Sequence, residues 1–180
     1  MSDSHPGTLV LGSGNPILTD DGVGIHVARD VAARLGSDPD LAEGIGFAEA
    51  SVGGLRLLEL LAGYERVILV DAIQTSDGLP GDIRQLSLAQ SPGVGKGGRK
   101  TRPYSSGTLH AGSTHDLSLA GALSWGRQNS LALPDDDHIL IVAVEAQDVL
   151  TFGETCTPAV AAAVPRAADL VFDLLKELNG

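Results

Sequence analysis

The segment that most constrains the fold is Arg66–Ile73 (RVILVDAI), an unbroken apolar, β-branched run with an acid near its end. Two further runs have the same character, Gly7–Gly12 (GTLVLG) and His138–Glu145 (HILIVAVE). A strand that is apolar at nearly every position is buried on both faces, as in parallel sheets. Segments with helical periodicity separate the runs, which indicates βαβ units. The predicted fold class is therefore α/β, with a mainly parallel sheet covered by helices on both faces.

The segments between these runs predict the remaining elements. A helix follows the first strand, with Val23, Val27, Val31 and Leu35 on one face and Gly36 as its C′ glycine. Ile45–Ser51 predicts a weaker strand, Leu55–Leu61 a short helix, and the alternating Gly81–Leu88 an edge strand. Two more helices are predicted, one capped by Thr114 and one that has Thr157 as N-cap and Pro158 at N1. Pro165 is expected to kink the last helix without ending it.

The length of 180 residues fits a single domain spanning residues 1–180, with a flexible tail at 1–6. Residues 90–112 are rich in Gly, Pro and Ser and contain four of the twelve Lys and Arg residues. A segment of this length and composition predicts a mobile surface loop, for which the sequence suggests no function.

Composition excludes several classes of partner. The formal net charge of −11 argues against nucleic acid and against anionic membrane surfaces, both of which attract clustered Lys and Arg. No apolar stretch approaches the roughly 18 residues of a membrane span, and residues 1–6 do not resemble a signal peptide. The single cysteine, Cys156, fits a reducing compartment. We therefore expect a cytoplasmic protein.

Chemistry-bearing residues follow the predicted strands. Ligands of open parallel sheets bind beyond the carboxyl ends of the strands. Three segments have polar residues at that edge: 12–22, which contains Asp20 and Asp21, the strand end at Asp71, and the helix start at His115. Two carboxylates and an imidazole from three distant segments suit a divalent cation with open coordination positions.

Four segments together resemble a known family: LVLGSGNPILTDDGVG, VDAI, STHDLSLAGAL and the C-terminal TPAV helix. In this order, from Leu9 to about Leu175, they are similar to the nickel–iron hydrogenase maturation proteases. The resemblance implies an α/β/α sandwich with a mainly parallel sheet, in the phosphorylase/hydrolase-like class. It also implies an endopeptidase that removes a short C-terminal peptide from the hydrogenase large-subunit precursor after nickel insertion.

The resemblance further implies that Asp21, Asp71 and His115 are the metal-contacting and catalytic residues. Many relatives have Glu where this chain has Asp21, so the metal distance or the loop must adjust. Nickel would be supplied by the substrate, and another divalent cation is compatible with the same site. The precursor is the implied partner, and a monomer is the simplest expectation.

Two other functions use the same residues or the same fold. A metal-binding escort that recognises the hydrogenase without cleaving it would need the same three side chains. A nucleotide-dependent enzyme of doubly wound fold would use Gly12 and Gly14 as half of a dinucleotide fingerprint. That second interpretation is weaker, because the third glycine is misplaced and two aspartates would repel a pyrophosphate.

The sequence leaves the mechanism open, since either a metal that activates carbonyl or water or a carboxylate acting as general base is compatible. We interpret Asp20 as an acid that satisfies the dipole of the following helix. Glu145 is either a supporting residue of the site or a surface acid, and Cys156 is a small buried residue rather than a nucleophile. His110 is a weaker candidate than His115, whereas His26, on a solvated helix face, and His138 receive no role.

Overall fold

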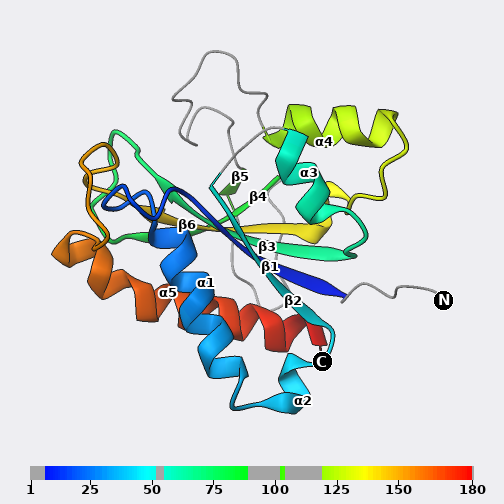
Figure 1. Cartoon of the computed structure of the whole chain (residues 1–180), viewed down its shortest axis with the longest axis horizontal. Helices are drawn as coiled ribbons and strands as arrows, with labels where there is room; N and C mark the ends of the chain where they lie inside the picture. The colour runs from blue at the N-terminus through cyan, green and yellow to red at the C-terminus, as the bar shows by residue number, and fades with distance from the viewer. Residues whose placement is uncertain (1–6, 52–54, 89–101, 104–118, 180) are drawn as a thin grey trace.

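The computed structural model describes residues 7–51, 55–88, 102–103 and 119–179 (Figure 1). The strands are β1 (Thr8–Ser13), β2 (Ile45–Ala50), β3 (Arg66–Ile73), β4 (Ile83–Ser87), β5 (Arg102–Pro103) and β6 (Ile139–Glu145). The helices are α1 (Val23–Leu35), α2 (Pro39–Ala42), α3 (Leu55–Leu61), α4 (Leu119–Gln128) and α5 (Pro158–Asn179), with a 3-10 turn at Asp136–His138.

These strands form a six-stranded sheet in the order β2-β1-β3-β6-β4-β5. The strands β2, β1, β3 and β6 are parallel, whereas β4 runs antiparallel to β6 and has only the short β5 on its other side. The mainly parallel sheet is thus confirmed. The chain leaves β1 for a neighbour on one side and returns as β3 on the other, so a topological switch point lies between β1 and β3.

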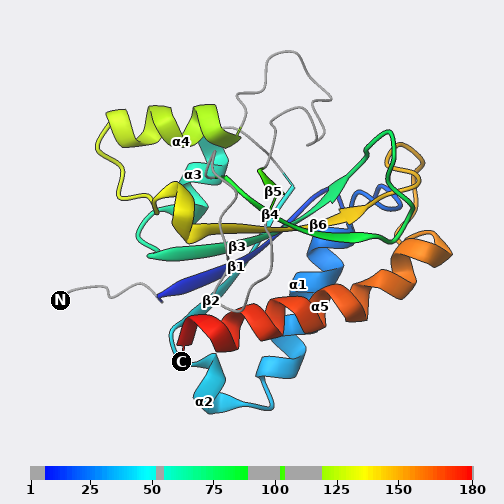
Figure 2. The same ribbon diagram turned by 180° about the vertical axis from the view of Figure 1, so that it is seen from behind.

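Helices cover both faces of the sheet (Figures 1 and 2). Sheet residues such as Val10, Ile68 and Val142 share one buried cluster with α1 and α5. The alternate residues, such as Leu69 and Ile141, share the other with α3 and α4. Since successive side chains of a strand point to opposite faces, the apolar runs fill both cores. The predicted three-layer α/β/α sandwich is therefore confirmed.

Two glycines bring α1 into backbone contact with the strand ends. A Cβ on Gly24 would lie 2.3 Å from the carbonyl oxygens of both Ser13 and Val70. A Cβ on Gly12 would lie 2.6 Å from the carbonyl oxygen of Gly24. Both distances are far inside van der Waals contact, so these positions require glycine. The glycine pattern thus serves close packing of the helix on the sheet, and the first turn of α1 is held over the switch point.

The structure changes some details of the prediction. The four-residue helix α2 was not predicted; the Asp38 side chain caps it by accepting the Leu41 N–H at 3.2 Å, and Pro39 begins it. Gly36 has φ −58°, not a left-handed conformation, so its interpretation as a C′ glycine is wrong. The helix α5 continues through Pro165, as expected. The predicted tail at 1–6, the cap at Thr114 and all of the 90–112 loop except β5 lie outside the described residues.

None of the helices within the described ranges is long and apolar enough to cross a membrane.

Candidate active site

Asp71 lies near the carboxyl end of β3, beside the switch point. Its side chain is buried, with 6% of the residue exposed. The carboxylate accepts the Ala72 N–H at 2.9 Å and is also hydrogen-bonded by the Ser13 side chain. Burial, which penalises the charged form, raises the pKa of Asp71 to about 7, and the nearby charge of Asp21 raises it further, against the opposing hydrogen bonds. The Asp71 carboxyl therefore holds a proton up to neutral pH.

Asp21 lies in the loop between β1 and α1 and is half-buried. Its Oδ2 accepts the backbone N–H of Asn15 at 2.7 Å. Gly14, at φ +129°, makes this turn possible, because a Cβ there would lie 1.8 Å from the Asp21 carbonyl oxygen. The loop thus closes on itself and holds the Asp21 carboxylate within electrostatic reach of Asp71. The Asp21 backbone thus lies directly against Gly14, a glycine that the nucleotide interpretation needs for the close approach of a pyrophosphate, and this disfavours that interpretation.

The structure thus brings together two of the three predicted site residues, Asp21 and Asp71, at the position where parallel sheets bind ligands. The third, His115, lies outside the described residues, as does His110. Within the described part of the chain, no three His, Cys, Asp or Glu side chains lie close enough to hold a metal ion. Ser13, which binds Asp71, was not predicted, although its place directly after the first apolar run was a usable signal.

Asp20 has a different role from its neighbour. It is fully buried, and its Oδ2 accepts the N–H groups of Gln147 and Asp148, both at 2.9 Å. The N–H of Thr157 donates to Oδ1 at 2.7 Å, and its hydroxyl donates to Oδ2 at 2.9 Å. The prediction that Asp20 satisfies the α1 dipole is wrong, because all four hydrogen bonds to its carboxylate come from residues after β6 and none comes from α1. The carboxylate ties the loop after β1 to the loop after β6.

Glu145 ends β6 and is also buried, so the surface-acid interpretation is wrong. Its carboxylate accepts the Thr75 N–H and, at 3.0 Å, the Thr75 hydroxyl. Arg84 approaches it to 3.5 Å. A Cβ on Gly78 would overlap this carboxylate. Glu145 therefore holds the loop after β3, the strand that positions Asp71.

The remaining candidates stay outside the acid pair. Burial and the charge of Asp20 raise the pKa of the Cys156 thiol to about 11, so it stays protonated and unreactive, as predicted.

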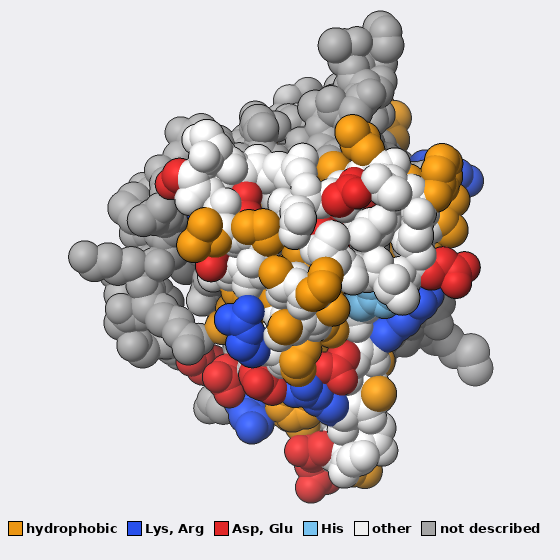
Figure 3. All heavy atoms as spheres, turned by 90° about the vertical axis from the view of Figure 1, so that its left-hand side faces the viewer, with side chains coloured by type: hydrophobic (Ala, Val, Ile, Leu, Met, Phe, Trp, Pro, Cys, Tyr) orange, Lys and Arg blue, Asp and Glu red, His pale blue; other side chains and the backbone are white. Residues whose placement is uncertain are grey.

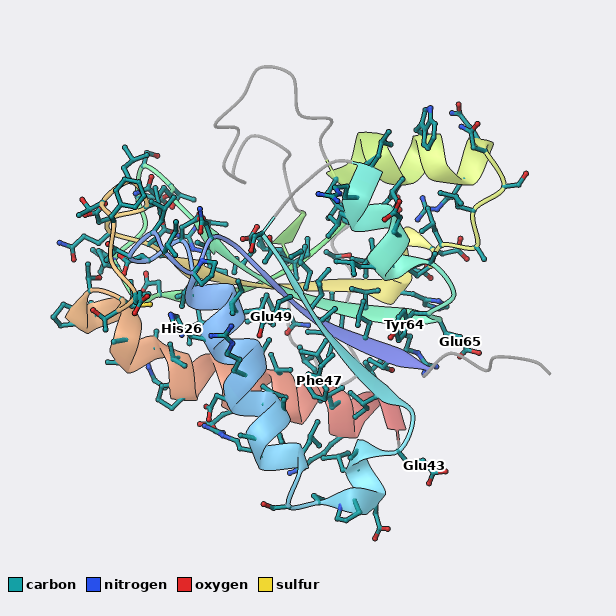
Figure 4. The ribbon with its side chains drawn as sticks, in the orientation of Figure 1. His26, Glu43, Phe47, Glu49, Tyr64 and Glu65 are labelled. Carbon is teal, nitrogen blue, oxygen red and sulfur yellow. The ribbon has the colours of Figure 1, made fainter. Side chains whose placement is uncertain are left out.

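His26 is half-buried rather than on a solvated face; its Nε2 is buried and has no hydrogen-bond partner among the described residues. Figure 4 shows it on α1, on the same side of the sheet as Glu49 of β2. The Arg29 hydrogen bond, then the charges of Arg29 and His26, lower the Glu49 pKa. His138 is exposed.

Comparison with known proteins gives a consistent set of relatives, although no family model matches the chain. The hydrogenase 2 maturation protease of Escherichia coli (strain K12) is 30% identical over 86 residues. That match covers 48% of this chain and 50% of the relative, so it spans about half of the relative's length.

Similarity to solved structures extends over most of the chain. The hydrogenase maturating endopeptidase HybD of E. coli superposes with a TM-score of 0.67 and 25% identity, covering 94% of this chain and 92% of that one. The [NiFe] hydrogenase maturation protease HybD of Thermococcus kodakarensis shares the fold, with a TM-score of 0.62, 20% identity and coverage of 93% and 98%.

Proposed function

We infer that this chain belongs to the nickel–iron hydrogenase maturation protease family and is an endopeptidase that removes a short C-terminal peptide from the large-subunit precursor. The observation that carries this inference is the acid pair at the switch point. Asp71 is buried on β3, and Asp21 is held in the closed loop between β1 and α1. The two carboxyls lie within electrostatic reach of each other. An arrangement that costs stability in this way is typical of catalytic sites.

The two carboxyls have complementary chemistry. Peptide hydrolysis by water needs a base that takes a proton from the water and an acid that gives one to the reacting group. In a mechanism that uses the carboxyls alone, Asp71, with its pKa raised to about 7 by burial and by Asp21, retains a proton and serves as the acid. Asp21, which accepts a hydrogen bond from Asn15, serves as the base. A buried carboxyl with a raised pKa beside a second carboxylate is typical of an acid–base pair.

The same pair fits a divalent cation. Two carboxylates offer oxygen ligands, and a cation beside them would offset the cost of ionising the buried Asp71. We propose that the nickel of the precursor is recognised here by Asp21, Asp71 and His115; another divalent cation would fit the same donors. Such a cation would polarise the scissile carbonyl or lower the pKa of water. The place of His115 in this set rests on the family resemblance.

Three variants test the assignment: Asp21→Asn, Asp71→Asn and His115→Ala. Each should retain the fold and lose roughly a hundredfold or more of the rate of tail removal, because each removes a proton-transfer or metal-contacting group. The rate is followed by intact mass on the nickel-loaded precursor, and the fold is checked by circular dichroism. Asp173→Asn, a change of an exposed acid on α5, far along the chain from the site loops, provides a matched control. Full processing by all three variants would exclude this site.

A further inference from the structure

The most exposed large apolar side chains lie on loops at the end of the sheet that holds the candidate active site. Among the described residues, Leu150 and Phe152 are each 80% exposed, Leu79 is 68% exposed and Ile17 is 50% exposed, the four highest values for large apolar residues. They come from the loops after β1, β3 and β6, which gather at one end of the sheet in Figure 1. Figure 3 looks onto this end and shows apolar side chains gathered on it. We call Ile17, Leu79, Leu150 and Phe152 the apolar rim.

Hydrogen bonds hold the rim in place. Leu18 and Phe152 form an antiparallel bridge, and the Gly153 N–H donates to the Ile17 carbonyl at 3.0 Å. The four hydrogen bonds to the Asp20 carboxylate join the same two loops, the one after β1 and the one after β6. The third loop joins them where the Gly81 N–H donates to the Glu145 carbonyl at 2.8 Å. The apolar side chains are therefore presented on ordered loops, which lowers the entropic cost of binding a partner.

Charge on the same loops has one sign. Residues 15–22, 74–82 and 146–157 contain no Lys or Arg and six acids: Asp20, Asp21, Asp77, Asp82, Asp148 and Glu154. Two arginines from neighbouring elements lie near these loops, and each already has a partner. Arg84 forms an ion pair with Glu145, and Arg166 donates a hydrogen bond to the Gly81 carbonyl. A partner that complements this surface presents apolar side chains flanked by basic ones.

We propose that the apolar rim docks the segment of the precursor next to its C-terminal extension, a segment of apolar side chains with basic flanks. This inference rests on the proposed function. Ile17 of the rim and Asp21 of the acid pair belong to one closed loop, four residues apart. The rim and the acid pair therefore share one end of the sheet, and we expect a polypeptide that reaches Asp21 and Asp71 to contact the rim as well.

The double variant Leu150→Ser/Phe152→Ser tests the proposal. Both side chains are exposed, so the fold should persist, as thermal unfolding will verify. Binding is measured as the Kd for the nickel-loaded precursor, by biolayer interferometry on an Asp21→Asn background that blocks cleavage. We expect the Kd to rise about tenfold or more, equivalent to about 1.4 kcal/mol or more. In the cleaving enzyme, KM should rise by a similar factor while kcat changes less than about twofold. Because the complementarity includes charge, binding should also weaken as salt increases.

Trp125→Ser is the matched control, because Trp125 is an exposed apolar residue on α4, outside the rim. This variant should leave both Kd and KM unchanged. An unchanged Kd in the rim variant would overturn the docking proposal while leaving the endopeptidase intact. If the wild-type chain binds the precursor without cleaving it, the proposed activity fails and the rim variant still tests docking. A dimer in light scattering that the rim variant dissolves would assign the surface to a second copy of the chain and overturn the proposal.

Discussion

Asp20 and Asp21 are adjacent and chemically identical, yet their carboxylates have separate tasks. Asp20 is fully buried and accepts four hydrogen bonds from residues more than 120 positions away. Asp21 is half-buried and accepts one hydrogen bond, from Asn15 within its own loop. The first carboxylate stabilises the loops on which the site is built, and the second faces Asp71. Stability and activity should therefore separate between these two residues.

Substituting each acid tests this separation. Asp20→Ala should lower the free energy of unfolding by about 3 kcal/mol or more, because it leaves several buried N–H groups without an acceptor. Asp21→Asn should change it by less than about 1 kcal/mol while processing is lost. Urea unfolding followed by circular dichroism measures both. Equal losses of stability in the two variants would contradict the division of roles.

Asp71 should make stability depend on pH. In the unfolded chain its pKa is near the ordinary value of 3.8, whereas in the folded chain its pKa is about 7. Between these values the folded state binds more protons than the unfolded state, so its contribution to stability falls as pH rises through this window and is constant above it. Asp71→Asn lacks this titration. The variant should therefore gain stability relative to wild type between about pH 4 and pH 8, by on the order of 4 kcal/mol at most.

Chemical denaturation across this pH range, with chelator present so that no cation neutralises the pair, measures the effect. A difference between Asp71→Asn and wild type that does not change with pH would show that the carboxyl is not buried as described.

At the scale of the elements, the site depends on how closely α1 approaches β1 and β3. Gly12 and Gly24 remove the side chains that would separate them. This contact sets the relative position of the two acids, because Asp21 precedes α1 by two residues and Asp71 belongs to β3. A change in the helix–sheet distance therefore changes the separation of the two carboxyls.

Gly24→Ala should lower the free energy of unfolding by about 1–3 kcal/mol, because its Cβ would meet two strand carbonyl oxygens. It should also slow processing by moving Asp21 from Asp71. Gly36→Ala at the other end of α1 is the control; its φ of −58° suits alanine and its nearest neighbour is 3.4 Å away. That change should be neutral or slightly stabilising. Differential scanning calorimetry compares them, and equal melting temperatures would contradict the close packing.

Much of the sheet was predictable from sequence because its strands are buried on both faces and therefore read as continuous apolar runs. Arg66–Ile73 and Leu55–Leu61 match the observed bounds of β3 and α3. The short α2 was missed because it depends on a single local cap at Asp38. The role of Asp20 was missed and that of Glu145 stayed open between two interpretations for another reason: Thr157 lies 137 residues from Asp20 and Thr75 lies 70 residues from Glu145. Only the folded chain brings those donors to the carboxylates.

Over the whole molecule, the switch point, the acid pair and the apolar rim lie at the same edge of the sheet. The Asp21–Asp71 pair was predictable because acids that follow parallel strands meet at their carboxyl ends. The rim was not, because exposed apolar residues in loops have no periodic pattern. The two features together fit the proposed function, in which a polypeptide lies across a pair of carboxyls.

The most direct test incubates the purified chain with a C-terminally extended hydrogenase large subunit, once loaded with nickel and once without it, and reads both by intact mass. We expect that only the nickel-loaded precursor loses its C-terminal peptide. Persistence of the full-length loaded precursor while it binds the chain would contradict the endopeptidase and support the non-cleaving escort instead.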